Sequence, residues 1–539
     1  MSGLGQLLVD SLLAFRGETA VVEVRRRTIT QEVGYDGLLD RCAALASVLS
    51  ERIEPGDRVV ILAENQVAWL VAGVATWWVG GVLVPIDARL EPGEQAALVA
   101  HAKPALAIGD AALLDSLPHV PCPALAIDGP GWPEPDAAAF PSVAPCDPES
   151  RATLVYTSGT GGTPRACVLS HRAYLAQWRA LVQVAPIAPG DRWFSFLPTN
   201  HAIDFMCGFI GPLCTGATIV HQRVLRPENL LWTLRNLDIT HLAVVPALLE
   251  AFRKGVETAI DARPPWQQTA HGLLVELGSR FQSPDVKRHL LPHVRTSLGP
   301  RLRRMYCGGA AARPDTLRFF HELGVPVAVG YGLTEACTVI SLQDAASPRT
   351  DTVGRVLPGL ELRIADRDAD GVGEVEVRGD TLMSGYLDDP AATAAAFTAD
   401  GFLRTGDLGR LDPTGELCLV GRVRDIIVTS AGKNVYPEDV ERGLGVLPCD
   451  DLAVFSATFL WPERGVGGHA EDLIAVCHGG EPSDVARALV EAQRARPART
   501  RVRGVVAFPE PFPRTSSRKL QRGVLAEKVR ALGLAAVEL

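Results

Sequence analysis

The stretch Leu154-Val-Tyr-Thr-Ser-Gly-Thr-Gly-Gly-Thr-Pro-Arg-Ala-Cys-Val-Leu-Ser-His171 joins two apolar runs through a loop of small residues. From Thr157 to Thr163 every residue is Gly, Ser or Thr, and the cation Arg165 follows. Between a strand and a helix-like segment, such a loop offers backbone N–H groups and hydroxyls without bulky side chains, as a polyphosphate requires. The loop is therefore a candidate phosphate-binding loop. A plain glycine-rich turn is the alternative, and the mismatch to G-x-x-x-x-G-K-[ST] disfavours a P-loop kinase or GTPase.

The sequence around this loop alternates between short apolar runs and helical patterns. Arg58–Leu62, Gly81–Pro85 and Ala105–Gly109 are predicted to be strands, and the pattern from Leu38 to Arg52 is typical of a helix. This alternation predicts an α/β fold with mainly parallel strands that are buried on both faces. From 352 to 419, short apolar runs separated by Gly/Asp turns predict a small β-rich subdomain.

An uncharged run, Trp69–Ile86, reaches the lower length limit for a membrane-spanning helix. Gly80-Gly81 divides it into a helix-like half and a β-branched half that ends at Pro85. We therefore predict a buried helix followed by a buried strand, and no transmembrane segment. Residues 247–300 are predicted to be mostly helical.

Size, charge and cysteine use limit the class of protein. A chain of 539 residues is too long for one ordinary core, so at least two domains are expected. The formal net charge of -9 argues against nucleic acid as the main partner. The 11 cysteines include no CxxC pair, and the N-terminus lacks a basic segment before an apolar one. We therefore expect a cytoplasmic protein without a disulfide framework, zinc site or signal peptide.

Six motifs, taken in order, resemble the signature of the adenylate-forming superfamily of acyl- and aryl-CoA synthetases, nonribosomal peptide adenylation domains and luciferases. They are Tyr156-Thr-Ser-Gly-Thr-Gly-Gly-Thr-Pro-Arg165, Gly330-Tyr-Gly-Leu-Thr-Glu335, Arg404-Thr-Gly-Asp407, Gly421-Arg-Val-Arg-Asp425, Gly432-Lys-Asn-Val-Tyr-Pro-Glu438 and Pro513-Arg-Thr-Ser-Ser-Arg-Lys519. The chain is most similar to the long-chain fatty acyl-CoA synthetases. This closer resemblance rests on the long helical stretch before Arg301, the run from Leu302 to Ala310, and the long loop in Ile426-Ile-Val-Thr-Ser-Ala-Gly-Lys-Asn434.

The resemblance implies an architecture. It is an α/β protein with a large N-terminal adenylation domain, residues 1–420, built of parallel-sheet α/β subdomains and a small β-rich subdomain. A hinge at 421–424 would lead to a smaller, mobile C-terminal α+β domain, residues 425–539. Residues 421–539 carry 17 Lys and Arg against 15 Asp and Glu, so this part is slightly basic beside an acidic body.

The resemblance also implies which residues bind MgATP. Glu335 would bind Mg²⁺, Thr334 would contact phosphate, and Arg165 stands where the family usually has Lys. An acidic residue near a polyphosphate is needed to hold the metal, although a Glu after a turn is otherwise a common helix-start residue. The remaining contacts with the nucleotide are assigned to Thr157, Ser158, Gly159, Thr160, Gly161, Gly162, Thr163, Gly309, Ala310, Tyr331 and Gly332.

Further roles are implied for five residues nearer the C-terminus. Asp407 would accept hydrogen bonds from both ribose hydroxyls, because a carboxylate has two oxygens. Arg422 would approach the nucleotide, and Arg424 would be the hinge residue. Lys519 would stabilise the charge between the substrate carboxylate and the α-phosphate, and Lys433 would line the thiol channel. Solvated turn arginines and an exposed loop lysine are the alternatives.

His201 lies at the position where acyl- and aryl-CoA synthetases carry a His beside the carboxylate pocket. Amino-acid-activating domains carry an Asp at the position of Ile203, so an amino acid substrate is not expected. Asp204, one residue further on, leaves a substrate amine as an alternative, and a buried structural histidine is the alternative for His201.

The expected function is ATP-dependent activation of a fatty carboxylic acid to acyl-AMP, followed by thioester formation with CoA. The chain would then be a fatty acid–CoA ligase of the AMP-forming type that uses ATP, Mg²⁺ and CoA. One alternative is transfer of the acyl group to the phosphopantetheine of a carrier protein. Another is a degenerate binder of nucleotide or acyl chain, because Gly161, Arg165, Ala166 and Arg518 depart from the family's usual residues.

Overall fold

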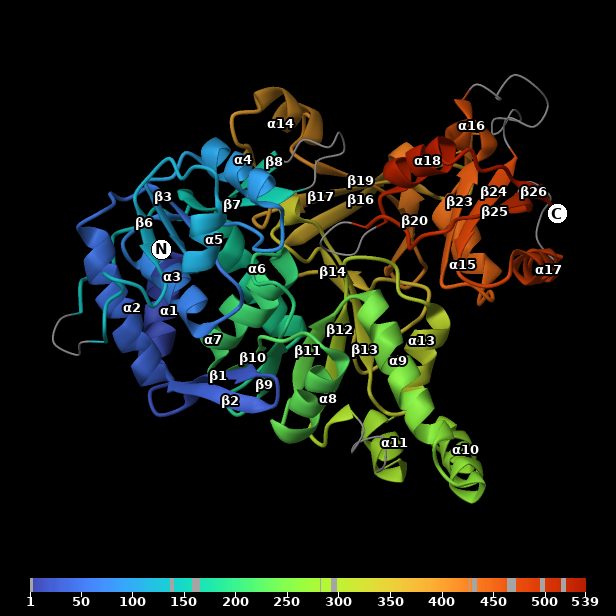
Figure 1. Ribbon diagram of the computed structural model, residues 1–539, viewed down its shortest axis with the longest axis horizontal. Coiled ribbons are helices and arrows are strands. Elements are labelled where there is room, and N and C mark those ends of the chain that lie inside the picture. Colours follow the sequence, from blue (N-terminus) through green and yellow to red (C-terminus); the bar gives the residue numbers. More distant parts are fainter. Residues whose placement is uncertain are drawn as a thin grey trace. The chain divides into compact units, whose positions relative to one another are not determined.

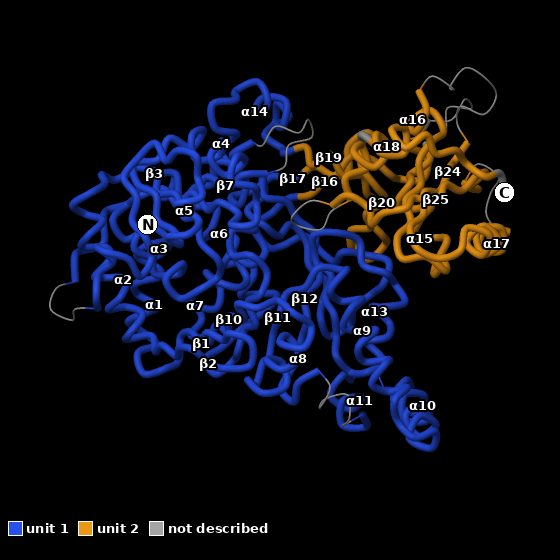
Figure 2. The backbone as a smooth tube through the Cα atoms, in the orientation of Figure 1, with its two compact units in different colours: residues 1–361, 377–403 blue, residues 362–376, 404–539 orange. Residues whose placement is uncertain are grey.

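The computed structural model describes residues 3–135, 140–157, 165–281, 283–291, 298–425, 427–428, 434–462, 472–494, 500–514 and 520–539. The chain forms two compact units (Figures 1 and 2). Unit 1 consists of Met1–Glu361 and Val377–Leu403, and unit 2 of Leu362–Glu376 and Arg404–Leu539. The sequence analysis also predicts that the C-terminal domain rotates about a hinge at 421–424, and this rotation stays a prediction.

Unit 1 contains two sheets, of which the first has seven strands. In spatial order they are β18 (Gly385–Tyr386), β8 (Arg165–Ser170), β7 (Arg151–Thr157), β4 (Val82–Pro85), β3 (Arg58–Leu62), β5 (Leu106–Gly109) and β6 (Ala124–Ala126). β3 pairs in parallel with β4 and β5, whereas β7 and β8 pair antiparallel. The three strands predicted from the apolar runs are thus confirmed as the centre of a mainly parallel sheet.

The second sheet of unit 1 has nine strands. In spatial order they are β15 (Arg355–Val356), β14 (Ser341–Leu342), β13 (Val327–Tyr331), β12 (Arg304–Cys307), β11 (His241–Val244), β9 (Arg192–Ser195), β10 (Thr218–Gln222), β1 (Thr19–Arg25) and β2 (Thr28–Gly34). The run from β13 to β1 is parallel throughout. Because the carboxyl ends of parallel strands meet at one edge, this sheet brings loops distant in sequence together.

Helices cover and join the two sheets. They are α1 (Leu4–Ala14), α2 (Tyr35–Ser50), α3 (Val67–Trp78), α4 (Pro92–Ala102), α5 (Ala111–Ser116), α6 (His171–Val184), the π-helix η1 (Asp204–Ile210), α7 (Gly211–Thr215), α8 (Pro227–Asn236), α9 (Pro246–Asp261), α10 (Pro265–Ser279), α11 (Pro284–Leu290), α13 (Pro314–Glu322), the 3-10 helix η2 (Thr334–Ala336) and α14 (Pro390–Ala396). The prediction that 247–300 is mostly helical is confirmed by α9, α10 and α11.

α3 explains the uncharged run from Trp69 to Ile86. The run divides at Gly80-Gly81, as predicted, into α3 and the buried strand β4. The Trp77 indole donates to the carbonyl of Ala152 on β7, 2.9 Å away, and its ring stacks on Phe209 of η1 at a centroid distance of 5.9 Å. α3 therefore packs between the seven-stranded sheet and η1, with α1 and α2 also against it, and every residue of this helix except Ala68 is buried.

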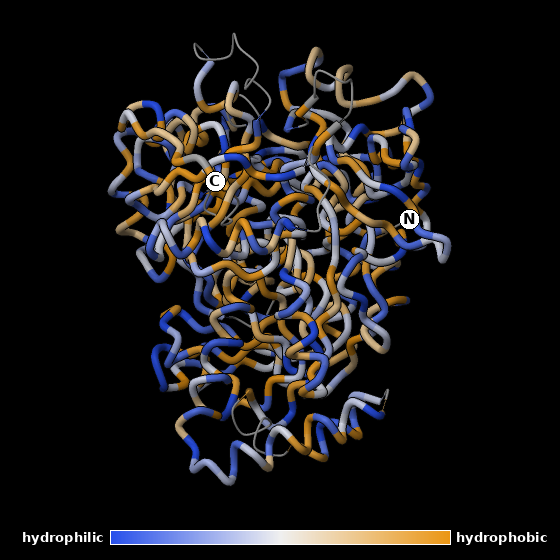
Figure 3. The backbone as a smooth tube through the Cα atoms, turned by 90° about the vertical axis from the view of Figure 1, so that its right-hand side faces the viewer, coloured by the Kyte–Doolittle hydropathy of each residue, from blue (hydrophilic) through white to orange (hydrophobic). Residues whose placement is uncertain are grey.

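Within the described ranges no helix is both long and apolar enough to cross a membrane. In Figure 3 the hydrophobic stretches of the chain are short and alternate with hydrophilic ones, which agrees with this finding.

The predicted phosphate-binding loop joins two strands, not a strand and a helix-like segment. Ala166, Cys167, Val168 and Leu169 are four consecutive buried residues, and β8 pairs antiparallel with β7. A strand covered on both faces has no polar alternation, so its sequence is not distinguishable from a buried helix by periodicity. The helix that was expected begins later, as α6 at His171, capped by the Ser170 hydroxyl.

Unit 2 is built of smaller sheets. One sheet has the spatial strand order β16 (Leu360–Ala365), β17 (Gly373–Gly379), β19 (Leu403–Leu411) and β20 (Leu417–Arg422), and most of its residues belong to unit 2. A second is the pair β21 (Ile427–Val428) and β22 (Asn434–Val435), and a third consists of β23 (Asp451–Ser456), β24 (Leu473–His478), β25 (Val502–Ala507) and β26 (Val537–Glu538). The helices are η3 (Val423–Asp425), α15 (Pro437–Leu444), α16 (Ala457–Leu460), α17 (Pro482–Ala492) and α18 (Arg522–Ala531). The predicted fold class, parallel-sheet α/β with a β-rich part and a C-terminal α+β part, is confirmed.

Candidate active site

The predicted site residues form two groups, one in each unit. In unit 1 they follow strand ends: Thr157 ends β7, His201 follows β9, Gly309 and Ala310 follow β12, and Glu335 follows β13. In unit 2, Asp407 and Arg422 lie on the neighbouring strands β19 and β20. Ser158, Gly159, Thr160, Gly161, Gly162, Thr163, Lys433 and Lys519 lie outside the described residues.

Both ends of the phosphate-binding loop are held by the sheet. Thr157 and Arg165 are paired across β7 and β8, and the Thr157 hydroxyl is 3.5 Å from the Arg165 carbonyl oxygen. The Arg165 guanidinium lies over the Tyr386 ring, 5.5 Å from its centroid, and its Nε is 3.5 Å from a carboxylate oxygen of Asp389. Since the Arg165 side chain is 41% exposed, this cation remains accessible to a phosphate.

Glu335 lies in η2 and contacts the same tyrosine as Arg165. The Tyr386 hydroxyl donates to Glu335 Oε1 at 3.1 Å, and the Met383 N–H donates to the Glu335 carbonyl oxygen at 2.8 Å. Burial, and then the negative charge of Glu335, raise the pKa of Tyr386 above its ordinary value. The phenol therefore stays protonated near neutral pH and acts as a hydrogen-bond donor to the carboxylate.

The turn that carries Tyr331, Gly332, Thr334 and Glu335 is tight. A Cβ atom at Gly332 would lie 1.7 Å from the carbonyl oxygen of Thr338, so only glycine allows this approach. Thr338 has a φ of 110°, which is unfavourable for a β-branched residue. Such strain is maintained by surrounding contacts, and here the Thr338 hydroxyl donates to the Ala202 carbonyl at 3.1 Å. The turn that carries the predicted metal ligand is thereby joined to the segment that carries His201.

His201 faces a carboxylate that the sequence analysis did not assign. Its Nε2 is 3.3 Å from Oδ2 of Asp87, which follows β4 and is 6% exposed. Burial by itself raises the pKa of Asp87, but His201 and Arg89 outweigh burial and hold that pKa below its ordinary value. Asp87 is therefore a carboxylate at neutral pH.

Asp204 is committed to contacts inside the protein. It is 2% exposed, and the hydroxyls of Ser195 and Thr199 donate to its Oδ2 at 2.8 and 3.0 Å. Burial raises the pKa of Asp204 to about 7, opposed by the two hydroxyl hydrogen bonds. This geometry disfavours Asp204 as a partner for a substrate amine.

Ile203 gives this part of the site an apolar surface. A Cβ atom at Gly308 would lie 3.6 Å from Ile203 Cδ1, and one at Gly309 would lie 3.8 Å from it. The Ile203 side chain therefore lies close to both glycines. Gly309 has a φ of 86°, and Ala310 beside it is exposed. An apolar side chain beside two glycines suits the acyl part of a carboxylic acid and offers no charge to an amine.

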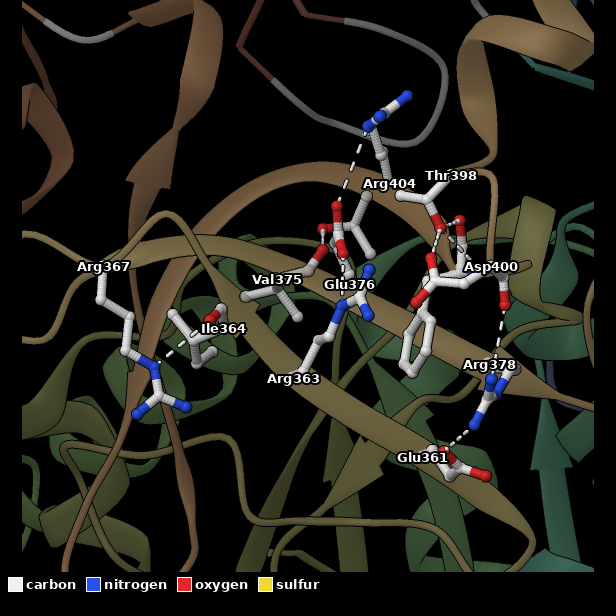
Figure 4. A network of polar contacts seen from close by, with 12 residues as sticks. Glu361, Arg363, Ile364, Arg367, Val375, Glu376, Arg378, Thr398, Asp400 and Arg404 are labelled. Atoms are coloured by element: carbon white, nitrogen blue, oxygen red, sulfur yellow. Dashed lines mark hydrogen bonds and ion pairs between the residues drawn. The ribbon is translucent and has the colours of Figure 1, made fainter.

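In unit 2 the predicted ribose-binding carboxylate is paired with an arginine. Arg422 Nε is 3.1 Å from Asp407 Oδ1. Asp407 N–H donates to the Thr405 hydroxyl, which donates to the carbonyl of Val375. The preceding Arg404 lies 3.8 Å from Glu376, which also accepts from Arg363 at 2.7 Å (Figure 4). Arg424 lies in η3, and its side chain is outside the description.

The donors fit a magnesium ion that is held mainly by a nucleotide. Mg²⁺ prefers oxygen ligands and is commonly bound by one or two carboxylates together with substrate phosphates. Glu335 would supply one carboxylate, which the Tyr386 hydroxyl orients. In the part of the chain that the structure describes, no group of three or more His, Cys, Asp or Glu side chains is arranged to hold a metal ion.

Three residues of this site were missed by the sequence analysis: Asp87, Tyr386 and Asp389. Asp87 had a usable signal, since it is the first polar residue after a predicted buried strand. Tyr386 and Asp389 had none, because β18 reaches β8 from more than 200 residues further along the chain.

Comparisons with known proteins agree with this arrangement. A family model described as AMP-binding enzyme matches residues 11–387. The chain is 28% identical to a 3-[(3aS,4S,7aS)-7a-methyl-1,5-dioxo-octahydro-1H-inden-4-yl]propanoyl:CoA ligase of Rhodococcus jostii, over 93% of this chain and 94% of that protein. It is 30% identical to the long-chain-fatty-acid–CoA ligase FadD15 of Mycobacterium bovis, over 76% of this chain and 73% of that protein. ATP-bound MatB from Rhodopseudomonas palustris has a similar fold, with a TM-score of 0.79, 23% identity, and coverage of 99% of this chain and 100% of its own.

Proposed function

Since the chain belongs to the AMP-binding enzyme family, we propose that it activates a carboxylic acid with MgATP and transfers the acyl group to the thiol of CoA. The family membership confirms the resemblance to adenylate-forming enzymes that the six motifs indicated. In the first step the substrate carboxylate attacks the α-phosphorus of ATP, and pyrophosphate leaves. In the second step the CoA thiol attacks the acyl carbonyl, and AMP leaves.

The observation that carries this proposal is the cluster at the base of the phosphate-binding loop. Arg165 lies over the ring of Tyr386 and Glu335 accepts a hydrogen bond from its hydroxyl, so a cation for phosphate and a carboxylate for Mg²⁺ are held within one cluster. When bound, Mg²⁺ would neutralise phosphate charge that develops as pyrophosphate departs. A loop of small residues with one accessible cation and one metal-binding carboxylate beside it suits ATP better than an uncharged ligand.

His201 and Ile203 are assigned to the carboxylic acid. The imidazole of His201, which has Asp87 on one side, would hold the substrate carboxylate by a hydrogen bond. Ile203 and the glycines beside it would contact the acyl chain. An apolar side chain and a hydrogen-bonding imidazole would thus bind the two ends of a carboxylic acid.

Unit 2 is assigned the remaining roles. Asp407 would bind the ribose, Arg422 the nucleotide, and Lys519 the developing charge during adenylation. We propose that residues 425–539 rotate about the hinge at 421–424 between the two steps, so that Lys433 replaces Lys519 at the reaction centre. Hinges of a few residues between domains are a common means of alternating two active conformations.

For the substrate, we propose a medium- or long-chain fatty acid. The closer resemblance to long-chain fatty acyl-CoA synthetases and the similarity to FadD15 support this choice. A second candidate is a bulky alicyclic propanoate, because the Rhodococcus relative, named for such a substrate, matches nearly the whole chain. Both candidates attach the carboxylate to a mainly hydrocarbon body, which suits contact with Ile203.

CoA is the proposed acceptor, and the phosphopantetheine of a carrier protein is the alternative. Both present the same thiol, so the described residues do not choose between them. We propose that the protein works in the cytoplasm, where ATP and CoA are available.

The test is a product assay on the purified full chain. The protein is incubated with MgATP, CoA and either straight-chain acids of about eight to eighteen carbons or an alicyclic propanoate, and the products are identified by mass spectrometry. Acyl-CoA with AMP and pyrophosphate is the expected result, and the preferred acid identifies the substrate class.

Acyl-AMP without acyl-CoA would replace CoA by a carrier protein as the acceptor. If no acid yields pyrophosphate, the degenerate binder is the better description. Direct binding of ATP, measured by calorimetry, then separates a nucleotide binder from a chain that does not bind nucleotide.

A further inference from the structure

Tyr386 touches two predicted site residues that come from distant parts of the chain. Its ring lies under the Arg165 guanidinium, and its hydroxyl donates to Glu335. Tyr386 is on the edge strand β18, where it pairs with Cys167 of β8, two residues beyond Arg165. Its backbone N–H donates to the Thr393 hydroxyl at 2.9 Å, which fixes the strand from the other side.

We propose that Tyr386 is a positioning residue that holds Arg165 and Glu335 apart in their working orientations and thereby couples phosphate binding to metal binding. The inference rests on the proposed function, because it assigns Arg165 to phosphate and Glu335 to Mg²⁺. The six motifs assign no role to Tyr386, because Gly385-Tyr386 lies outside all of them.

The physical problem at this point is that a cation and a carboxylate lie beside the same ring. A direct ion pair between them would use the cation needed for phosphate and the charge needed for the metal. Within the described part of the chain, Arg165 forms its ion pair with Asp389 and none with Glu335. The neutral tyrosine between them offers its π face to the cation and its hydroxyl to the carboxylate.

Each of these contacts leaves the partner's function intact. A hydrogen bond from a neutral phenol orients the Glu335 carboxylate without cancelling its charge, as outer-shell donors do for metal ligands. The ring face orients the guanidinium while its N–H groups remain able to bind phosphate oxygens. A planar guanidinium stacks on an aromatic face better than an ammonium, which gives a reason for Arg at a position where the family usually has Lys.

Two variants separate the two contacts of Tyr386. Tyr386→Phe removes the hydroxyl and keeps the ring, whereas Tyr386→Leu removes both. Tyr174→Phe is the matched control, because it removes a buried phenol that hydrogen-bonds to Thr153 and touches neither Arg165 nor Glu335. Thermal unfolding of each variant shows whether it is folded.

The readout is ATP affinity, measured by calorimetry on the full chain with Mg²⁺ and again with EDTA. We expect Tyr386→Phe to weaken ATP binding about tenfold with Mg²⁺ and less than twofold with EDTA, as for a lost outer-shell partner. Tyr386→Leu should also weaken binding in EDTA, by about two- to fivefold, because Arg165 loses its support. The control should bind ATP as the wild type does under both conditions.

Wild-type affinity of Tyr386→Phe for ATP in Mg²⁺ overturns the inference and leaves the proposed function standing. Equal losses with and without Mg²⁺ in Tyr386→Phe also overturn it, since the hydroxyl would then act on the nucleotide and not on the metal. If the wild-type protein binds no ATP, the proposed function fails and the inference fails with it. The Phe variant alone decides the matter if the Leu variant does not fold.

Discussion

Units 1 and 2 hold their polar residues in different ways. In unit 1, Asp87, His201 and Glu335 follow buried parallel strands, and an apolar core that includes the wholly enclosed helix α3 fixes those strand ends. In unit 2 the polar residues are fixed mainly by each other: Asp407 by Arg422, Glu376 by Arg363 and Arg404, and Glu441 by Arg522. We therefore expect the stability and activity of unit 1 to respond to changes in packing and in buried neutral groups, and those of unit 2 to respond to changes in charge.

The largest effect is expected from Lys519→Ala. Loss of a cation at the developing charge should reduce adenylation by about 10²- to 10³-fold, measured as acid-dependent exchange of pyrophosphate into ATP. Thioester formation from added acyl-AMP and CoA should change little. Lys528→Ala is the control, because that lysine forms an exposed pair with Glu510. Equal losses in both steps would mean that unit 2 acts as a whole and not through a separate residue for each step.

Glu441→Gln should destabilise unit 2 by about 3 kcal/mol, because it leaves the buried Arg522 without its principal counter-charge. Arg522 donates to Glu441 at 2.6 Å and lies 4.0 Å from Asp425. Hydrogen exchange followed by mass spectrometry should show faster exchange in β23 and α18 and an unchanged exchange rate in α3. Glu510→Gln, an exposed carboxylate, is the control, and a similar loss of protection there would contradict the distinction between buried and exposed pairs.

Acidification should act first on unit 1. Burial lowers the pKa of His171, His221 and His241 to about 4, so all three are neutral in the folded protein at neutral pH. Unfolded histidines titrate near 6.5, so between about pH 6.5 and 4 the unfolded state binds more protons and stability falls as pH falls. The loss from pH 7 to 5.5 is on the order of 1 kcal/mol for each histidine. Between these pH values, hydrogen exchange should show a larger loss of protection in β10 and β11 than in β24 and β25. A larger loss in β24 and β25 would contradict the difference between the two units.

The smallest effect is expected from Arg165→Lys. An ammonium keeps the charge but loses the stacking on Tyr386, which is worth less than about 1 kcal/mol at an exposed site. ATP affinity should therefore fall about two- to fivefold, as measured by calorimetry, and Arg172→Lys, an exposed residue paired with Glu149, should leave it unchanged. Tighter ATP binding by Arg165→Lys would show that the arginine is a compromise and not an adaptation to the ring.

Much of unit 1 follows from the sequence alone. Gly80-Gly81 divides an uncharged run into α3 and β4, and the apolar runs that become β3 and β5 are interrupted by polar turns. The antiparallel strand β8 was missed, because a strand buried on both faces lacks the alternation that identifies strands. Glu335 and Arg165 were assigned through motifs, because no periodic pattern indicates a ligand-binding residue, and their roles stay predictions.

Contacts between distant segments could not be predicted in the same way. Tyr386 reaches Arg165 and Glu335 only because β18 completes the edge of the seven-stranded sheet. His201 faces Asp87 although the strands that precede them, β9 and β4, belong to different sheets. Local sequence records which residues are apolar or flexible, whereas these contacts depend on strand order, for which one sequence holds no direct signal.

The order of strands in the nine-stranded sheet has a consequence for synthesis of the protein. β1 joins this sheet only through β10, which lies about 200 residues later in the chain. The hairpin of β1 and β2 therefore emerges from the ribosome long before the strand that will cover its open edge exists. α3 can pack early against α1 and α2, but Trp69 and Trp77 must wait for Phe205 and Phe209 of η1. The nascent chain therefore exposes one edge of this hairpin and part of these two tryptophans for as long as the intervening residues take to be translated.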